Sequence, residues 1–214
     1  MAAGVDHFAQ IAAERRHLAA RLRGLTPEQL STQSLCGKWT VHDVIAHLVV
    51  PLVSTKWALA KAAVAGRGSF HGFNEALVRQ QARRGAEELL DDLDRRASSK
   101  FTPPGHDSNA PLADIKLHSL DITVPLGLDL GRPAESWRPV LDFLVSPAAD
   151  RGFVRRDRPE LRLVATDADW GGGSGPQVDG PAAALAASLS GRGALDDQLS
   201  GPGLVALRTW QKRV

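Results

Sequence analysis

Apolar residues recur every three or four positions in the first part of the chain, which is the spacing of a helix with one buried face. This pattern predicts a first helix over residues 6–22, with its charged residues outside. Further long helices are expected over residues 40–65, 72–97 and 111–124. Four long helices joined by loops of moderate length predict an antiparallel bundle.

Two helix starts carry a capping signal. Thr26 is followed by Pro27 and then, three residues after the threonine, by Gln29, which predicts a short helical turn. Thr40 is followed three residues later by Asp43, so the second long helix is expected to begin there. Pro51 lacks the amide hydrogen that a helix needs at that position, so this helix should bend or loosen near its middle.

The pattern changes in the last third of the chain. Residues 135–144 predict one further helix, and beyond Arg151 residues 161–166 alternate as a strand does. A glycine-rich turn over 170–175 and a short alanine-rich helix over 181–189 follow. Residues 203–210 fit either a strand or a helix. We therefore predict the α+β class, with a helical bundle over residues 1–150 and a small α+β domain over residues 151–214.

Composition places the chain among globular proteins. Its 214 residues and 43% hydrophobic content suit a packed core, and its apolar runs are too short to span a membrane. The first residues do not resemble a secretory signal, so the cytoplasm is the expected location. The formal charge is +2 and the arginines are scattered along the chain, which argues against a nucleic-acid partner.

Cys36 is the single cysteine of the chain, which excludes an intrachain disulfide and a cluster of thiolate metal ligands. Any metal must then be held by nitrogen and oxygen ligands. We expect Cys36 itself to be a small, buried or partly buried filler.

Asp114 and His118 are four residues apart on the fourth predicted helix, so they share a face and can approach one cation. His47, on the second long helix, is the candidate third ligand. Two imidazoles and a carboxylate would leave a coordination position open, as catalytic zinc sites do. By contrast, His42 is five residues from His47, about 140° around the helix, and should not share the ion.

Other readings of these residues stay open at this point. Asp and His four apart are common on ordinary helix faces. Asp121, three residues after His118, could accept a hydrogen bond from the ring of that ligand and fix its tautomer, or act as an outer ligand itself. It could also be a solvated or capping carboxylate near the helix end. We interpret Trp39 and Trp170 as packing residues outside the site.

Three stretches of sequence together resemble the mycothiol-dependent maleylpyruvate isomerase family, which belongs to the wider DinB-like metal-dependent superfamily. They are residues 37–48 around His47, the pair Phe73-Asn74, and residues 114–122 around His118. In the tail, residues 167–192 look like the small C-terminal α+β domain of that family. The resemblance spans nearly the whole chain and implies an N-terminal DinB-like four-helix bundle.

The resemblance also implies a ligand set and two cofactors. In that family a zinc ion is held at the positions of His47, Asp114 and His118, and mycothiol supplies the reactive thiol. Asp114 departs from the family, which has glutamate there, and loses about 1.5 Å of reach. Arg192 matches an arginine implicated in binding cofactor or carboxylated substrate, although a cation at the end of an alanine-rich helix needs no such role.

The expected function is a metal-dependent, mycothiol-using isomerase or S-transferase. Its partners would be a small-molecule thiol and a small electrophilic substrate, and members of the superfamily often pair as homodimers. One alternative keeps the metal but hydrolyses an amide or ester with bound water. Another, prompted by Asp114, is a binding protein without activity whose metal site has degenerated.

Overall fold

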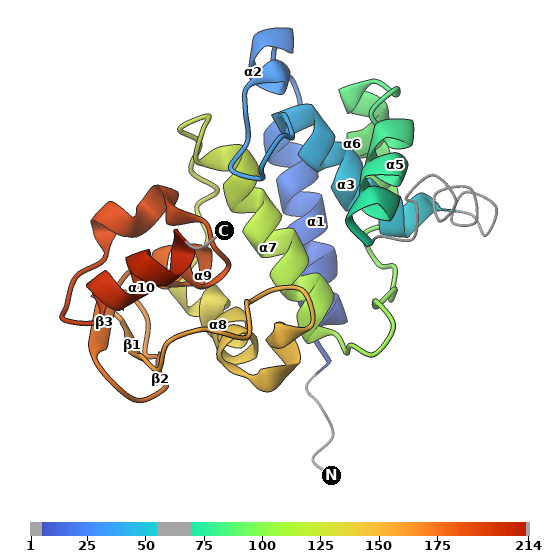
Figure 1. Ribbon diagram of the computed structural model, residues 1–214. Coiled ribbons are helices and arrows are strands. Elements are labelled where there is room, and N and C mark those ends of the chain that lie inside the picture. Colours follow the sequence, from blue (N-terminus) through green and yellow to red (C-terminus); the bar gives the residue numbers. More distant parts are fainter. Residues whose placement is uncertain (1–5, 55–69, 213–214) are drawn as a thin grey trace. The chain divides into compact units, whose positions relative to one another are not determined.

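The computed structural model describes residues 6–54 and 70–212, which divide into two compact units (Figure 1). The first unit contains the described parts of residues 1–103 together with residues 114–130, and the second contains residues 104–113 and 131–214. The chain is of the α+β class, as predicted. The domain boundary expected between residues 150 and 151 stays a prediction.

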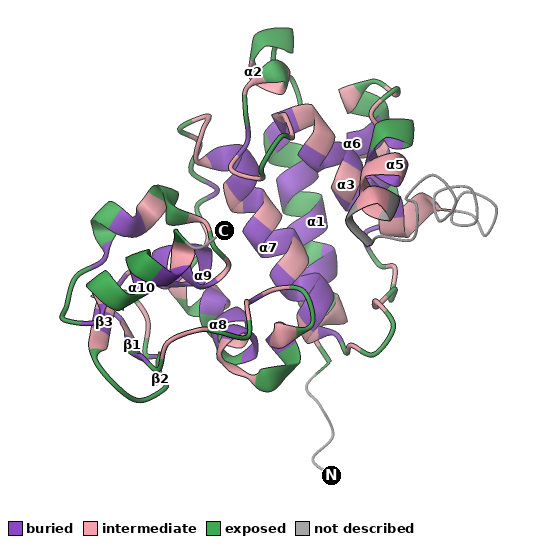
Figure 2. Cartoon of the chain, viewed as in Figure 1, coloured by how far each residue is buried: buried purple, intermediate pink, exposed green. Residues whose placement is uncertain are grey.

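The helical unit is a bundle, in agreement with the apolar periodicity of its sequence. Helix α3 packs against α5 and α6, and α1 packs against α6. Figure 2 shows the buried faces of α1 and α7 in purple. The helices are α1 (Phe8–Leu22), α2 (Pro27–Ser31), α3 (Val41–Val53), α5 (Phe70–Gln81), α6 (Ala86–Arg95) and α7 (Asn109–Thr123), of which α7 contributes its residues from Asp114 onward.

Both predicted capping boxes are present. The Thr40 hydroxyl accepts a hydrogen bond from the Asp43 amide at 3.2 Å, and the Asp43 carboxylate accepts one from the Thr40 amide at 2.9 Å. Thr26 and Gln29 form the same pair at the start of α2. Pro51 lies inside α3, which ends at Val53, and the expected continuation toward Ala65 falls outside the described residues.

The single helix predicted over residues 72–97 is wrong, because two helices, α5 and α6, occupy this stretch. Gly85 is the N-cap of α6 with extended backbone angles, and glycine costs about 1 kcal/mol in a helix interior. The break is held by Arg84, whose guanidinium contacts Glu88 at 2.7 Å and Asp92 at 2.6 Å. The helical spacing of apolar residues continues across the break, so the sequence pattern predicts one helix where the structure has two.

A buried ion pair joins α1 to α7. Lys116 is fully buried, and its ammonium lies 3.1 Å from the carboxylate of Glu14, which is also buried. Next to Glu14, the buried Arg15 donates hydrogen bonds to the carbonyl oxygens of Ala97 and Ser99, each at 2.9 Å. Charged groups are therefore part of the bundle's core and are compensated there by partners.

The second unit is built on a three-stranded sheet of order β2-β1-β3. The predicted strand is present as β1 (Arg162–Ala165), which pairs antiparallel with β2 (Gly171–Gly172) and parallel with β3 (Gln177–Gly180). Part of the expected glycine turn is therefore the strand β2. At Gly173, φ is +76° and a side chain would collide with the Leu161 carbonyl, so this position requires glycine.

Helices cover the rest of the second unit. The last segment, which the sequence left between strand and helix, is helical, whereas strand β3 was not predicted. Helix α9 is buried along most of its length and contacts α8, β1 and β3. The elements are η1 (Ala134–Trp137), α8 (Arg138–Val145), η2 (Pro147–Asp150), α9 (Ala182–Leu189), η3 (Gly193–Gln198) and α10 (Leu204–Gln211).

No helix within residues 6–54 and 70–212 combines the length and the apolar character needed to cross a membrane.

Replacing Thr40 with alanine should lower the free energy of unfolding by about 1 kcal/mol, because the first amides of α3 lose their side-chain acceptor. Urea denaturation followed by circular dichroism measures this change. Thr26→Ala is the matched control, since it removes the same box from α2, which buries no residue. We expect a smaller loss of stability in Thr26→Ala than in Thr40→Ala, because α3 is buried and α2 is not. Equal losses in the two variants would contradict this expectation.

Replacing Lys116 with methionine should destabilise the protein by about 3–5 kcal/mol, because the buried Glu14 carboxylate loses its cation. The double variant Lys116→Met, Glu14→Leu should recover a large part of that loss, since no buried charge then remains at the pair. Chemical denaturation of both variants tests this. A double variant less stable than Lys116→Met would show that the pair itself, and not the uncompensated charge, determines the effect.

Candidate metal centre

Helix α3 brings His47 to the candidate site two turns after its capped start. The residues on either side, Ala46 and Leu48, are buried in the bundle, while the His47 side chain keeps 16% of its surface exposed. Its Nε2 lies 3.5 Å from the Asp114 carboxylate. Its Nδ1 is buried and has no hydrogen-bond partner among the described residues.

Helix α7 supplies the other two side chains of the candidate centre. Asp114 and His118 lie one turn apart, and the Nε2 of His118 is 3.5 Å from the same carboxylate oxygen that faces His47. The two imidazole rings have centroids 4.5 Å apart. One ligand atom from each of His47, Asp114 and His118 lies within 4.8 Å of the others. The structure thus brings together all three residues selected from the sequence.

The Asp114 carboxyl is held in its ionised form. Burial opposes its ionisation, but the electrostatic attraction of His118, the hydrogen bond and attraction of His47, and the charge of Arg15 together outweigh burial and lower the pKa of Asp114 to about 2. A carboxylate between two imidazoles is therefore negatively charged at neutral pH. Such a charge favours a cation at this point.

Asp121 orients the second imidazole. Its carboxylate has no exposed surface and lies 2.7 Å from the Nδ1 of His118. A hydrogen bond from Nδ1 places the ring's lone pair on Nε2, which is the nitrogen that faces Asp114. This is the arrangement in which carboxylates commonly hold metal-binding histidines.

The loop between α2 and α3 forms one wall of the candidate centre. Its end residues Gln33 and Thr40 are bridged, and the Leu35 amide bonds the Asp121 carbonyl at 3.2 Å, which ties the loop to α7. The loop carries Trp39, whose ring centroid is 5.1 Å from that of His47 and 6.5 Å from that of His118. Trp39, for which the sequence predicts a packing role outside the site, therefore lies beside both candidate ligands.

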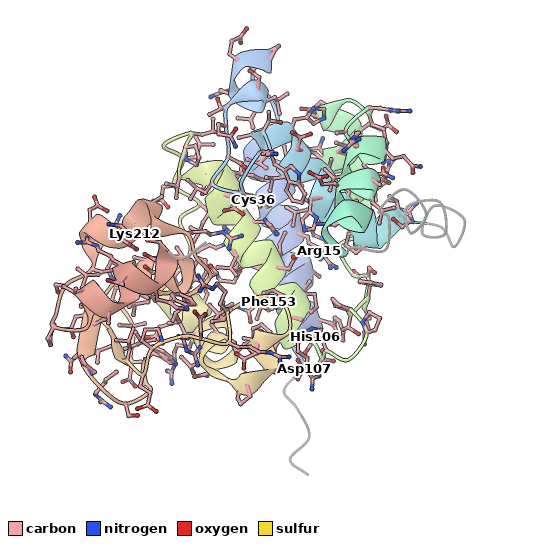
Figure 3. All side chains as sticks on the ribbon, viewed as in Figure 1. Arg15, Cys36, His106, Asp107, Phe153 and Lys212 are labelled. Carbon is pink, nitrogen blue, oxygen red and sulfur yellow. The ribbon has the colours of Figure 1, made fainter. Side chains whose placement is uncertain are left out.

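Cys36 lies on the same loop and was interpreted from the sequence as a filler (Figure 3). Its sulfur, the Asp121 carboxylate and a ring nitrogen of His118 lie within 4.8 Å of one another. The signal that could have identified both loop residues is their position immediately before the capped start of the helix that carries His47.

The remaining candidates have other contacts. The ring of His42 bonds the carbonyl of Arg84 at 3.0 Å, in line with its exclusion from the candidate centre. Arg192 belongs to the second unit, where it precedes η3 and its guanidinium donates to the Ser190 carbonyl at 3.3 Å. Its part in binding a cofactor or substrate stays a prediction. Trp170 is buried and donates its indole hydrogen to Asp142, which is the packing role expected for it.

The donor set fits a divalent cation. Two imidazole nitrogens and one ionised carboxylate are the ligands of many catalytic zinc sites, which keep a further position for water or substrate. Nitrogen and oxygen donors suit Zn²⁺ and its first-row neighbours better than Ca²⁺ or Mg²⁺, which prefer oxygen alone.

Two solved structures share the fold of this chain. One is described as the mycothiol-dependent maleylpyruvate isomerase and the other as a histidine-to-alanine mutant of that enzyme. The mutant structure aligns with a TM-score of 0.58 at 15% sequence identity, and the structure without the mutation aligns with a TM-score of 0.51 at 16% identity. Each alignment covers 91% of this chain and 92% of the chain in the solved structure. No curated protein sequence matches the chain significantly.

A family model supplies the sequence-level comparison. Residues 11–100 match the model described as the mycothiol maleylpyruvate isomerase N-terminal domain, and this segment includes the capped start of α3, the loop before it and His47. The matched segment and the shared fold agree with each other. The resemblance to the mycothiol-dependent maleylpyruvate isomerase family that the sequence suggested is therefore confirmed, and at the sequence level it covers residues 11–100, which match the model of that family's N-terminal domain.

Proposed function

We propose that this protein is a mycothiol-dependent enzyme, an isomerase of the maleylpyruvate isomerase kind or an S-transferase acting on a small electrophile. His47, Asp114 and His118 would hold a divalent cation such as Zn²⁺. The observation that carries the proposal is the convergence of these three side chains, from two helices, within 4.8 Å around an ionised carboxylate.

The shorter carboxylate of Asp114 is compatible with this proposal. The resemblance places a glutamate at this position in the family, yet the aspartate here already contacts the Nε2 atoms of both His47 and His118 at 3.5 Å. It needs no additional methylene to reach the two rings. We therefore expect Asp114 to act as a ligand and not merely as a remnant of one.

A bound zinc ion would supply the electrostatic stabilisation that keeps a thiol ionised near neutral pH. The chain itself provides the surroundings. Asp121 would hold His118 in the tautomer that offers Nε2 to the cation, and the ring of Trp39 lies beside both imidazoles. Arg192, which belongs to the second unit, stays a candidate for binding a cofactor or a carboxylated substrate, because a guanidinium can donate two parallel hydrogen bonds to a carboxylate.

A reactive thiol supplied by a small molecule, and not by the protein, is consistent with the composition of the chain. Cys36 is its single cysteine, and it lies on the His118 and Asp121 side of the cluster, where it does not belong to the three-residue group around Asp114. A small-molecule thiol such as mycothiol would therefore supply the nucleophile for the reaction. The thiol would add to the electrophilic substrate. In an isomerase, the thiol would then leave unchanged.

His47→Ala and His118→Ala should each lose stoichiometric Zn²⁺ binding and mycothiol-dependent isomerisation of maleylpyruvate, because one of three ligands is gone. Isothermal titration of metal-free protein and a turnover assay measure the two effects. His42→Ala is the matched control, since this histidine lies on the same helix and bonds the Arg84 carbonyl. It should retain both properties.

The proposed function fails if the wild-type protein binds no divalent metal, or if His47→Ala retains mycothiol-dependent turnover. Turnover of an amide or ester without any thiol, lost in the same variants, would instead favour the hydrolase.

Asp114→Glu should preserve stoichiometric Zn²⁺ binding and thiol-dependent turnover, whereas Asp114→Asn should weaken Zn²⁺ binding at least about tenfold, because the negative charge between the imidazoles is lost. Competition with a chromogenic chelator measures the affinities. If wild type and Asp114→Glu are both inactive and neither binds Zn²⁺, the site has degenerated and the protein is not this enzyme.

A further inference from the structure

We propose that Cys36, Asp121 and His118 form a second position for a thiophilic cation, and that this position competes with the His47–Asp114–His118 position for the shared imidazole. The two positions would lie on opposite ring nitrogens of His118. The proposal concerns only residues of the first unit and goes beyond the function proposed above.

The three side chains have the geometry of a ligand group. A sulfur, a ring nitrogen and a carboxylate oxygen lie within 4.8 Å of one another. Asp121 is fully buried and faces the Nδ1 of His118 at 2.7 Å, while Cys36 is partly exposed and is not in a disulfide. A cation can therefore approach from the side of the sulfur and meet a buried carboxylate and imidazole behind it.

The backbone fixes the cysteine in this place. The Cys36 amide donates to the Ser34 hydroxyl at 3.1 Å, and the adjacent Leu35 amide bonds the carbonyl of Asp121 itself. The Cys36 carbonyl accepts from the Trp39 amide at 3.1 Å. The loop therefore holds the sulfur next to the turn of α7 that carries His118 and Asp121.

The donor types distinguish the two positions. The first offers two nitrogens and one oxygen, whereas the second offers sulfur, nitrogen and oxygen. Thiolates favour soft cations, so Cd²⁺ is suited to the second position. Binding there would release the proton of the thiol to solvent, because the thiolate is the ligand.

The shared ring makes the two positions alternatives. A neutral imidazole has one lone pair, on one nitrogen, and its proton is on the other. A cation at the first position uses Nε2 of His118 and leaves the Nδ1 proton with Asp121. A cation at the second position uses Nδ1, and the proton moves to Nε2, where the Asp114 carboxylate lies 3.5 Å away and can accept it. One cation per chain is therefore expected.

This competition has a functional consequence. A cation held by Cys36 would take both His118 and Asp121 away from the first position. Thiophilic metals should therefore act as inhibitors by occupying a neighbouring position.

The test is a titration of metal-free wild-type protein with Cd²⁺ alone, followed by ultraviolet absorption. Thiolate-to-cadmium charge transfer reports the sulfur bond, and it can arise only from Cys36, since the chain has no other cysteine. We expect the absorption to rise and saturate at one Cd²⁺ per chain. Cys36→Ser should lose the absorption and still bind one Cd²⁺ through His47, Asp114 and His118.

The two histidines provide a matched pair of variants, because their rings are 4.5 Å apart but only one belongs to the second position. His47→Ala should keep the charge-transfer absorption, and His118→Ala should lose it at one equivalent of Cd²⁺. Circular dichroism spectra identical to that of the wild type establish that both variants are folded.

Three results would overturn the proposal. They are a wild-type protein that shows no thiolate absorption at one equivalent, a folded His47→Ala that loses it, and a folded His118→Ala that keeps it in full. None of these depends on mycothiol or turnover. A protein without thiol-dependent activity that still shows the expected absorption pattern would refute the proposed function and leave this inference intact.

Discussion

The ion pair between Lys116 and Glu14 is the constraint on which the geometry of the candidate centre depends. Successive residues of a helix are about 100° apart, so Lys116 points roughly opposite to both Asp114 and His118, which are two positions away on either side. The pair is 3.1 Å long and buried, and it fixes the rotation of α7 against α1. With that rotation set, Asp114 and His118 share the face of α7 that meets His47.

The same arrangement explains why charges are tolerated so close together. Buried ions are costly unless each has a partner, and here the negative charge of Asp114 faces the two imidazoles while Arg15 adds a positive charge nearby. Arg15 is itself held by two backbone carbonyls. Among the described residues, the Nδ1 of His47 is one of the buried side-chain atoms without a hydrogen-bond partner. An unsatisfied atom at a cluster of potential ligands is typical of a site arranged for binding more than for stability.

Much of the fold could be predicted because its determinants are local. The apolar period and the Thr40–Asp43 box define α3, and the alternating residues define β1. The break at Gly85 was missed because the apolar period continues across it. The strand β3 was missed because it depends on pairing with β1. At the site, helical spacing placed Asp114 beside His118, but the approach of His47 and of the loop depends on contacts between distant segments, such as that of Leu35 with Asp121.

Asp121 controls which ring nitrogen of His118 can bind a cation. Its carboxylate is fully buried and bonded to one nitrogen of His118, so the position of a single proton on that ring determines which side of it offers a lone pair. With the proton on Nδ1, the ring serves the cluster around Asp114. With the proton on Nε2, it serves Cys36. Because the carboxylates of Asp121 and Asp114 face opposite nitrogens of the ring, each tautomer finds an acceptor, and the chemistry of the centre depends on which cation is bound.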